Sequence, residues 1–283
     1  MTESKLLVMR SVAAMRREVV RWKAAGEIVG VVPTMGALHA GHLSLIRSAI
    51  AGCDRVIVTI FVNPTQFAVN EDLDSYPRGE AADLAKLAAL GADLAFCPNP
   101  DEMYPDGFAT SVKVEGLTEV MCGAGRPHHF GGVATVVSKL FIQSQADRAY
   151  FGKKDFQQCL VVTRMARDLN IPIEVVPVET VREADGLAMS SRNAYLSDVH
   201  RAVAPVIYKT IRDVAASVRE GQAPANAAAH GVEALKAAGI ERVEYLDVRD
   251  AETLAEEWPE GRAARVFIAV HLGETRLIDN VAV

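Results

Sequence analysis

Short β-branched runs alternate with longer Ala- and Leu-rich stretches through the first two-thirds of this 283-residue chain. Residues 28–34 (IVGVVPT) and 55–62 (RVIVTIFV) are typical of buried strands, and HLSLIRSAIAG between them has helical periodicity. A strand, a helix and a strand at this spacing predict a βαβ unit, which implies a parallel sheet with a right-handed crossover. No other feature constrains the fold as strongly.

The same alternation returns further along the chain. Helical stretches are expected at 80–91, 131–145 and 156–170, and strands at 92–98, 148–151 and 173–179. We therefore predict one doubly wound α/β domain, of the Rossmann-like type, over residues 1–181.

The pattern of predicted elements changes after Val181. Residues 199–239 are Ala-rich and helical, with an interruption at 221–226, and three strand candidates follow at 242–249, 264–272 and 275–283. Helices followed by adjacent strands predict a smaller α+β domain over residues 182–283.

Composition limits the classes of partner. The net charge of −6 argues against nucleic acid as the main partner, because no broad basic surface is available. The most hydrophobic strand-like run, residues 56–62, is too short to span a bilayer, and the N-terminus does not resemble a secretory signal. The four cysteines are scattered without a C-x-x-C pair, which suits a reducing compartment. We expect a cytoplasmic protein without a membrane contact.

The segment PTMGALHAGHLSL (33–45) joins the first predicted strand to its helix. Gly36 and Gly41 allow a tight turn, and His39 and His42 lie three residues apart at the helix entrance. A helix N-terminus at the carboxyl end of a parallel strand favours anions, so these histidines are candidates to donate hydrogen bonds to phosphate oxygens. Two ordinary surface or capping histidines are an equally weighted alternative, whereas a zinc site is less favoured because no further ligands lie nearby.

Two further segments leave strands at the same edge of the predicted sheet. In FVNPTQF (61–67), Asn-Pro turn chemistry accounts for Asn63 but not for Gln66, whose amide could bind a substrate hydroxyl or carboxylate. In YFGKKDFQQ (150–158), Lys154 could reach a phosphate, although a solvated lysine pair is the ordinary alternative.

A loop and a helix supply the remaining candidates. In DGLAMSSRN (185–193), Ser190, Ser191 and Arg192 combine two hydroxyls with a bidentate cation, a suitable grip for pyrophosphate, whereas capping of the next helix is the alternative. Ser197 is expected to cap that next helix. Asp83 could hold Mg²⁺ through water or phosphate, although acidic runs are more often simply solvated.

Together, PTMGALHAGHLSL, FVNPTQF, YFGKKDFQQ and DGLAMSSRN resemble, in order and spacing, the pantothenate synthetase family, also called pantoate–β-alanine ligases. The resemblance runs essentially end to end. It implies a two-step reaction in which the carboxylate of pantoate attacks the α-phosphate of ATP and the amine of β-alanine then attacks the acyl adenylate. Pantothenate, AMP and pyrophosphate would be the products, and the family is expected to be homodimeric.

The resemblance also assigns roles to residues of this chain. It implies phosphate contacts from His39 and His42, a triphosphate grip by Lys154, Ser190, Ser191 and Arg192, a pantoate pocket of Met35, Gln66 and Gln158, further ATP contacts at Met35, Gly152, Asp155, Val181 and Met189, and a magnesium-associated acid at Asp83.

The chain departs from the family pattern at two positions. Lys153 stands where the family often has glutamate, and Thr65 replaces a common methionine. Lys153 makes the identity of the phosphate lysine ambiguous, with Lys154 directly before Asp155 as the better match. Neither departure removes a chemical role.

The chemistry needs no side-chain nucleophile, because the substrate carboxylate attacks, and we find no credible triad. The stretch around residues 68–80 is nominated as a segment that closes over the adenylate. The rival functions are a nucleotidyltransferase that stops after nucleotidyl transfer and a non-catalytic nucleotide sensor. A class I aminoacyl-tRNA synthetase is disfavoured by the chain length and the acidic charge.

Overall fold

The computed structural model describes residues 6–68, 73–74 and 76–283. The chain forms two compact units. The first contains residues 1–119, 123–153 and 157–179, and the second contains residues 120–122, 154–156 and 180–283. The predicted boundary at residue 181 differs from this division mainly in two short segments, 120–122 and 154–156, which belong to the second unit.

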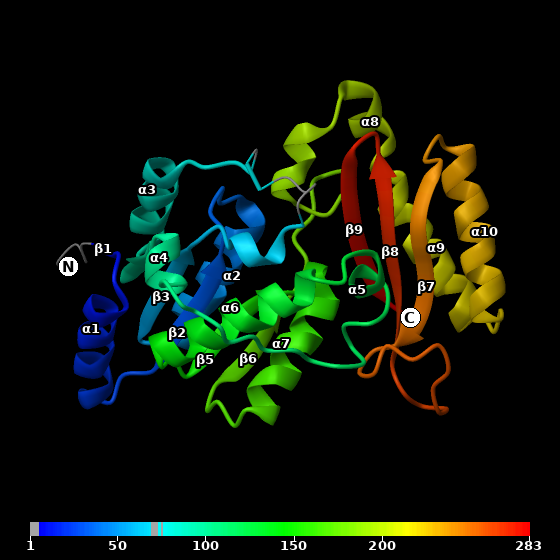
Figure 1. Ribbon diagram of the computed structural model, residues 1–283. Coiled ribbons are helices and arrows are strands. Elements are labelled where there is room, and N and C mark those ends of the chain that lie inside the picture. Colours follow the sequence, from blue (N-terminus) through cyan, green and yellow to red (C-terminus); the bar gives the residue numbers. More distant parts are fainter. Residues whose placement is uncertain (1–5, 69–72, 75) are drawn as a thin grey trace. The chain divides into compact units, whose positions relative to one another are not determined.

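Parallel strands form the sheet of the first unit, and among the described residues there are six, in the order β1-β4-β3-β2-β5-β6 (Figure 1). This confirms the predicted doubly wound class. The strands are β1 (Leu7–Met9), β2 (Val29–Thr34), β3 (Arg55–Ile60), β4 (Leu94–Phe96), β5 (Arg148–Gly152) and β6 (Glu174–Val178).

Right-handed crossovers place α1, α6 and α7 on one face of this sheet and α2 and α3 on the other. The packing agrees, because α1 lies against α6 and α2 against α3. On the α2 face, Val32, Ile46 and Leu87 are fully buried in one apolar cluster. The helices are α1 (Val12–Ala24), α2 (Ala40–Gly52), α3 (Glu80–Leu90), α4 (Pro100–Met103), α5 (Cys122–Gly125), α6 (His129–Ser144) and α7 (Phe156–Asp168), with 3₁₀ turns η1 (Pro64–Gln66) and η2 (Lys153–Asp155).

The centre of the sheet contains a topological switch point. The chain passes from β2 to its neighbour β3 on one side, and from β5 to its neighbour β6 on the other, while β2 and β5 pair with each other. In doubly wound sheets, ligands bind outside the carboxyl ends of two such strands. The loop that carries His39 leaves β2 at this point, and Gly152 ends β5 there.

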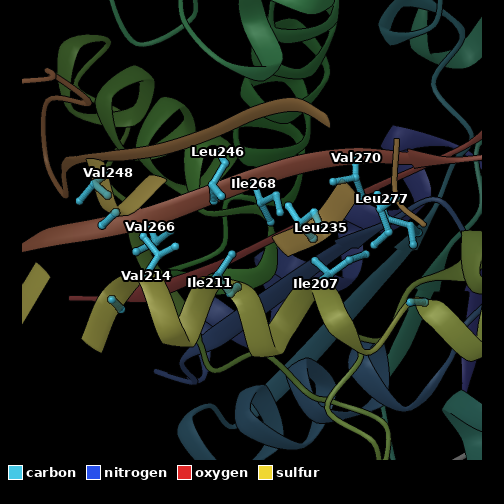
Figure 2. Close-up of a cluster of buried hydrophobic side chains, with 14 of the residues drawn as sticks. Ile207, Ile211, Val214, Leu235, Leu246, Val248, Val266, Ile268, Val270 and Leu277 are labelled. Carbon is cyan, nitrogen blue, oxygen red and sulfur yellow. The ribbon is translucent and has the colours of Figure 1, made fainter. Parts of the chain in front are cut away.

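The second unit contains a small antiparallel sheet with two long helices against it (Figure 1). Its core lies between α9 and α10 and the strands, and Figure 2 shows Ile211 of α9, Leu235 of α10 and Ile268 of β8 within it. The predicted α+β class is confirmed. The elements are η3 (Ser191–Tyr195), α8 (Asp198–Val203), α9 (Val206–Arg219), α10 (Pro224–Ala237), β7 (Arg242–Asp250), β8 (Ala264–Leu272) and β9 (Thr275–Ala282).

Most predicted elements are present within a few residues of their expected bounds. The interruption predicted at 221–226 is confirmed, because α9 ends at Arg219 and α10 begins at Pro224. Ser197 caps α8 as expected, its hydroxyl accepting from the His200 backbone N–H at 3.3 Å. The sequence analysis did not include β1 and α1. In the described part of the chain, no helix has the length and apolar character needed to cross a membrane.

Gly231, in the middle of α10, provides a test of the second core. A Cβ atom at this position would lie 2.6 Å from Leu246 Cδ2 and 2.8 Å from Val214 Cγ2. We predict that Gly231→Ala lowers the free energy of unfolding by about 1–3 kcal/mol, although alanine is the better helix former, because overpacking outweighs propensity. Urea unfolding measures the change. Exposed Ala229→Gly in the same helix is the control and should cost about 1 kcal/mol from propensity alone. A more stable Gly231→Ala variant would contradict this packing.

Candidate active site

The loop between β2 and α2 has an unusual backbone. Gly36 has φ +84°, and Ala37 follows with φ +50°, a conformation that costs energy for a residue with a side chain. The Thr34 hydroxyl holds the start of the loop: it donates to the Thr59 carbonyl at 2.6 Å and accepts from the Gly36 N–H at 3.2 Å. The loop therefore leaves the strand in a fixed direction.

Asp83, on the first turn of α3, anchors the same loop from the side. Its carboxylate accepts from the backbone N–H groups of Ala37 (2.8 Å) and Leu38 (2.9 Å). Lys86, one turn further on, donates to the Leu38 carbonyl at 2.7 Å and lies 3.5 Å from the Asp83 carboxylate. Asp83 is 2% exposed. Two charge-assisted hydrogen bonds of about 1.5–3 kcal/mol each offset the strain at Ala37.

These contacts fit an anchor of the loop better than a metal ligand. Both carboxylate oxygens of Asp83 already accept N–H donors, and a lysine stands beside them. Within the described ranges, no three His, Cys, Asp or Glu side chains form a group that could hold a metal ion. The magnesium role of Asp83 stays a prediction.

His39 and His42 stand at the N-terminus of α2 with their rings 4.2 Å apart. His39 is the N-cap residue, and its Nδ1 accepts from the Gly41 N–H at 3.1 Å. His42 Nδ1 accepts from the His39 N–H at 3.5 Å. An imidazole nitrogen that accepts a hydrogen bond carries no proton, so each neutral ring carries its proton on Nε2. Capping of the helix and donation to a phosphate are therefore compatible roles for these histidines, because a ring that accepts at Nδ1 has its N–H at Nε2.

Gln66, after β3, and Met35, after β2, lie in contact, with Gln66 Nε2 3.3 Å from Met35 Sδ. Asn63 is 1% exposed and is more than a turn residue, because its Nδ2 donates to Gln66 Oε1 (3.1 Å) and to the Gly132 carbonyl (3.2 Å). The Tyr104 hydroxyl donates to Asn63 Oδ1 at 2.7 Å. The sequence analysis missed Tyr104, which lies in a loop region without a motif.

The lysine pair after β5 is divided between the two units. Lys153 belongs to the first unit and forms an ion pair with Glu179. Lys154 belongs to the second, lies 3.3 Å from the Asp155 carboxylate, and accepts at its carbonyl from Asn280 Nδ2 at 2.9 Å. Both lysines therefore lie beside a carboxylate, so the choice of Lys154 as the phosphate lysine still rests on its place directly before Asp155 in the family motif. Gln158 is half-buried on the first turn of α7.

The remaining candidates lie together in the second unit. The Met189 N–H donates to the Val181 carbonyl at 3.0 Å, which closes a hairpin over residues 181–189. Ser190 follows as the N-cap of η3, its hydroxyl accepting from the Arg192 N–H at 3.2 Å. The alternative considered for this loop is capping of the next helix, α8, which Ser197 provides; the Ser190 cap is a different one, on η3. It engages the backbone of Arg192 rather than its guanidinium. The nominated closing segment, 68–80, lies partly outside the described residues.

Comparison with known proteins places this arrangement in a family. The family model described as pantoate–β-alanine ligase matches residues 7–282. A pantothenate synthetase of Caulobacter vibrioides is 56% identical over 280 residues, covering 98% of each chain, and one of Dinoroseobacter shibae is 54% identical over 277 residues, covering 98% of this chain and 99% of the relative.

Solved structures agree. The crystal structure of pantothenate synthetase from Thermus thermophilus matches with a TM-score of 0.91 and 48% identity, covering 98% of this chain and 99% of that one. A pantoate–β-alanine ligase from Francisella tularensis, described as complexed with β-γ ATP and β-alanine, matches with a TM-score of 0.82 and 30% identity over 98% of both chains. The chain therefore belongs to the pantoate–β-alanine ligase family and is an enzyme of the ligase class.

Proposed function

We propose that this chain condenses pantoate with β-alanine through a pantoyl adenylate, using ATP. A pantoate carboxylate oxygen attacks the α-phosphorus of ATP, the bond to the β-phosphate bridge oxygen breaks, and pyrophosphate leaves. The β-alanine amine then attacks the acyl carbon, loses a proton, and expels AMP. The single observation that carries this proposal beyond family membership is the histidine pair, both rings accepting a backbone N–H at Nδ1 at a helix N-terminus beside the switch point.

The histidines supply charge stabilisation. As the carboxylate attacks, negative charge grows on the phosphate oxygens, and fixed N–H donors stabilise that charge without reorganising. The rings are fixed because their Nδ1 atoms accept from the backbone N–H groups of Gly41 and of His39 itself, and the loop before them is held by Asp83. The partial positive charge of the helix N-terminus adds to the same effect.

The other candidate residues bind and orient the substrates in this proposal. Orientation matters because a nucleophile that is already an anion needs placement more than activation. We assign the triphosphate to Lys154, Ser190, Ser191 and Arg192, further ATP contacts to Met35, Gly152, Asp155, Val181 and Met189, and pantoate to Met35, Gln66 and Gln158.

Three further parts of the proposal rest on the sequence and the family resemblance alone. They are magnesium as the companion of ATP, a homodimeric assembly and a cytoplasmic location. Magnesium usually binds through one or two carboxylates together with substrate phosphates. Because the contacts of Asp83 do not suit that role, no step of the reaction is assigned to the metal.

Isotope exchange tests the reaction directly. We predict that the enzyme, given ATP and pantoate without β-alanine, incorporates labelled pyrophosphate into ATP, because adenylation is reversible and needs only those two substrates. Omitting pantoate should abolish the exchange. Absence of exchange in the complete mixture would count against the ligase reaction, and ATP binding without AMP release over many turnovers with all substrates would favour a nucleotide sensor.

His42→Ala tests the role of the histidine pair. We expect the adenylation rate to fall by roughly a hundredfold or more, because a donor to the transition state is lost. Single-turnover formation of pyrophosphate measures the rate. Exposed His230→Ala in α10 is the matched control and should behave as the wild type. If His42→Ala altered only the apparent affinity for pantoate, the assigned role would be wrong.

Gln66→Ala tests the pantoate pocket. We predict a raised apparent KM for pantoate, roughly tenfold for the loss of a good hydrogen bond, with the KM for ATP unchanged. Steady-state kinetics of AMP formation, with each substrate varied in turn, measure both values. The control is Gln222→Ala, in the second unit before α10. An unaltered pantoate dependence would remove Gln66 from the pocket.

A further inference from the structure

The side-chain amide of Gln66 is held by a relay of hydrogen bonds that begins at Tyr104. Tyr104 follows α4, and its ring packs edge-on against Phe108, with centroids 5.1 Å apart, and near Phe61 at 6.3 Å. Its hydroxyl donates to Asn63 Oδ1 at 2.7 Å. Burial raises the pKa of this hydroxyl, and this effect outweighs the lowering by the contact with Thr65. The hydroxyl is therefore protonated at neutral pH and can donate a hydrogen bond.

Asn63 transmits a fixed polarity. Its Oδ1 also accepts from the hydroxyl (3.0 Å) and the backbone N–H (3.4 Å) of Thr65, while its Nδ2 faces the Gly132 carbonyl at 3.2 Å. A backbone N–H can only donate and a carbonyl can only accept. If the Asn63 amide were turned by 180°, its NH₂ group would face the Thr65 N–H and its oxygen would face the Gly132 carbonyl. Asn63 therefore presents an N–H to Gln66.

Gln66 receives that N–H on Oε1, so its Nε2 must point the other way. There it meets the thioether of Met35 at 3.3 Å. Sulfur is a weak acceptor, and a carboxylate or hydroxyl oxygen would replace it with a stronger bond. Without the relay, the Gln66 amide could direct either Oε1 or Nε2 toward Met35. The relay fixes Nε2, the donor, in that direction.

The backbone under Gln66 is held as tightly. The Gln66 carbonyl lies 3.0 Å from His129 Nδ1 and 3.4 Å from Arg126 Nη2. Helix α6 approaches so closely that a Cβ on Gly132 would lie 2.4 Å from the Thr65 carbonyl oxygen and 2.6 Å from Gln66 Cα, whereas a Cβ on Gly131 would meet nothing within 4 Å. Rotation of the amide is therefore the freedom that remains, and the relay removes it.

We propose that Tyr104 is a positioning residue that, through Asn63, makes Gln66 a hydrogen-bond donor toward the oxygen atoms of the acid substrate. This inference rests on the proposed function, in which Gln66 lines the pantoate pocket. Thr65 strengthens the relay in this chain, because its hydroxyl is a donor that the family's common methionine lacks.

Tyr104→Phe removes the hydroxyl and keeps the ring. We expect the apparent KM for pantoate in the pyrophosphate exchange assay to rise roughly three- to tenfold, with the KM for ATP and the maximal rate within about twofold of wild type. Tyr208→Phe, in the second unit, is the matched control and should leave all three values unchanged. A Tyr104→Phe variant with wild-type pantoate dependence, or with equal losses for both substrates, would overturn the inference.

A double-mutant cycle separates positioning from general damage. In a Gln66→Ala background, Tyr104→Phe should have no further effect on the KM for pantoate, because the amide it orients is gone. Additive effects would overturn the inference.

Gly132→Ala should weaken pantoate binding in the same way as Gln66→Ala, whereas Gly131→Ala should not. Equal behaviour of the two glycine variants would also count against the inference. If the wild type itself showed no pantoate-dependent exchange, the proposed function would fail first, and that outcome is distinct from failure of the relay alone.

Discussion

The carboxylate of Asp83 is the contact on which the candidate site depends most. It accepts from two consecutive N–H groups, those of Ala37 and Leu38, in a loop that would otherwise leave the strained φ of Ala37 without compensation. The pair of charge-assisted bonds is buried, so water does not compete with them. With the loop held, His39 arrives at the N-terminus of α2 in the extended conformation that a cap requires.

The histidines and Gln66 are governed by one principle. Each of these side chains has one acceptor atom and one donor atom. In each case a hydrogen bond from the protein occupies the acceptor atom, and this fixes the position of the donor. Backbone N–H groups occupy Nδ1 of His39 and His42, and Asn63 occupies Oε1 of Gln66. The result is a set of N–H donors at the carboxyl ends of β2 and β3, which suits phosphate and carboxylate oxygens and needs no side-chain nucleophile.

Sequence reasoning located the segments but not the partners within them. The motifs around His39, Gln66 and Lys154 could be found because glycine, proline and polar residues directly after buried strands mark loop geometry. The contact of Asp83 with the loop was not predicted, because a carboxylate at a helix start has no preferred partner in the sequence, whereas in the fold it lies against a loop 45 residues away. Tyr104 was missed for the same reason, being 41 residues from Asn63 in a segment without periodicity.

By itself, the sequence determined the doubly wound class, the small α+β unit, the cap at Ser197 and the family, because these depend on patterns within a few residues or on motifs in fixed order. It did not determine β1, which has three residues and gains its stability by pairing with β4, far along the chain. Tertiary structure alone decided which carboxylate holds the loop before His39 and how the amide of Asn63, which orients Gln66, is turned. The physical reason is that these partners come from elements remote in sequence: Asp83 lies 45 residues from Leu38, and Gly132 and Tyr104 lie 69 and 41 residues from Asn63.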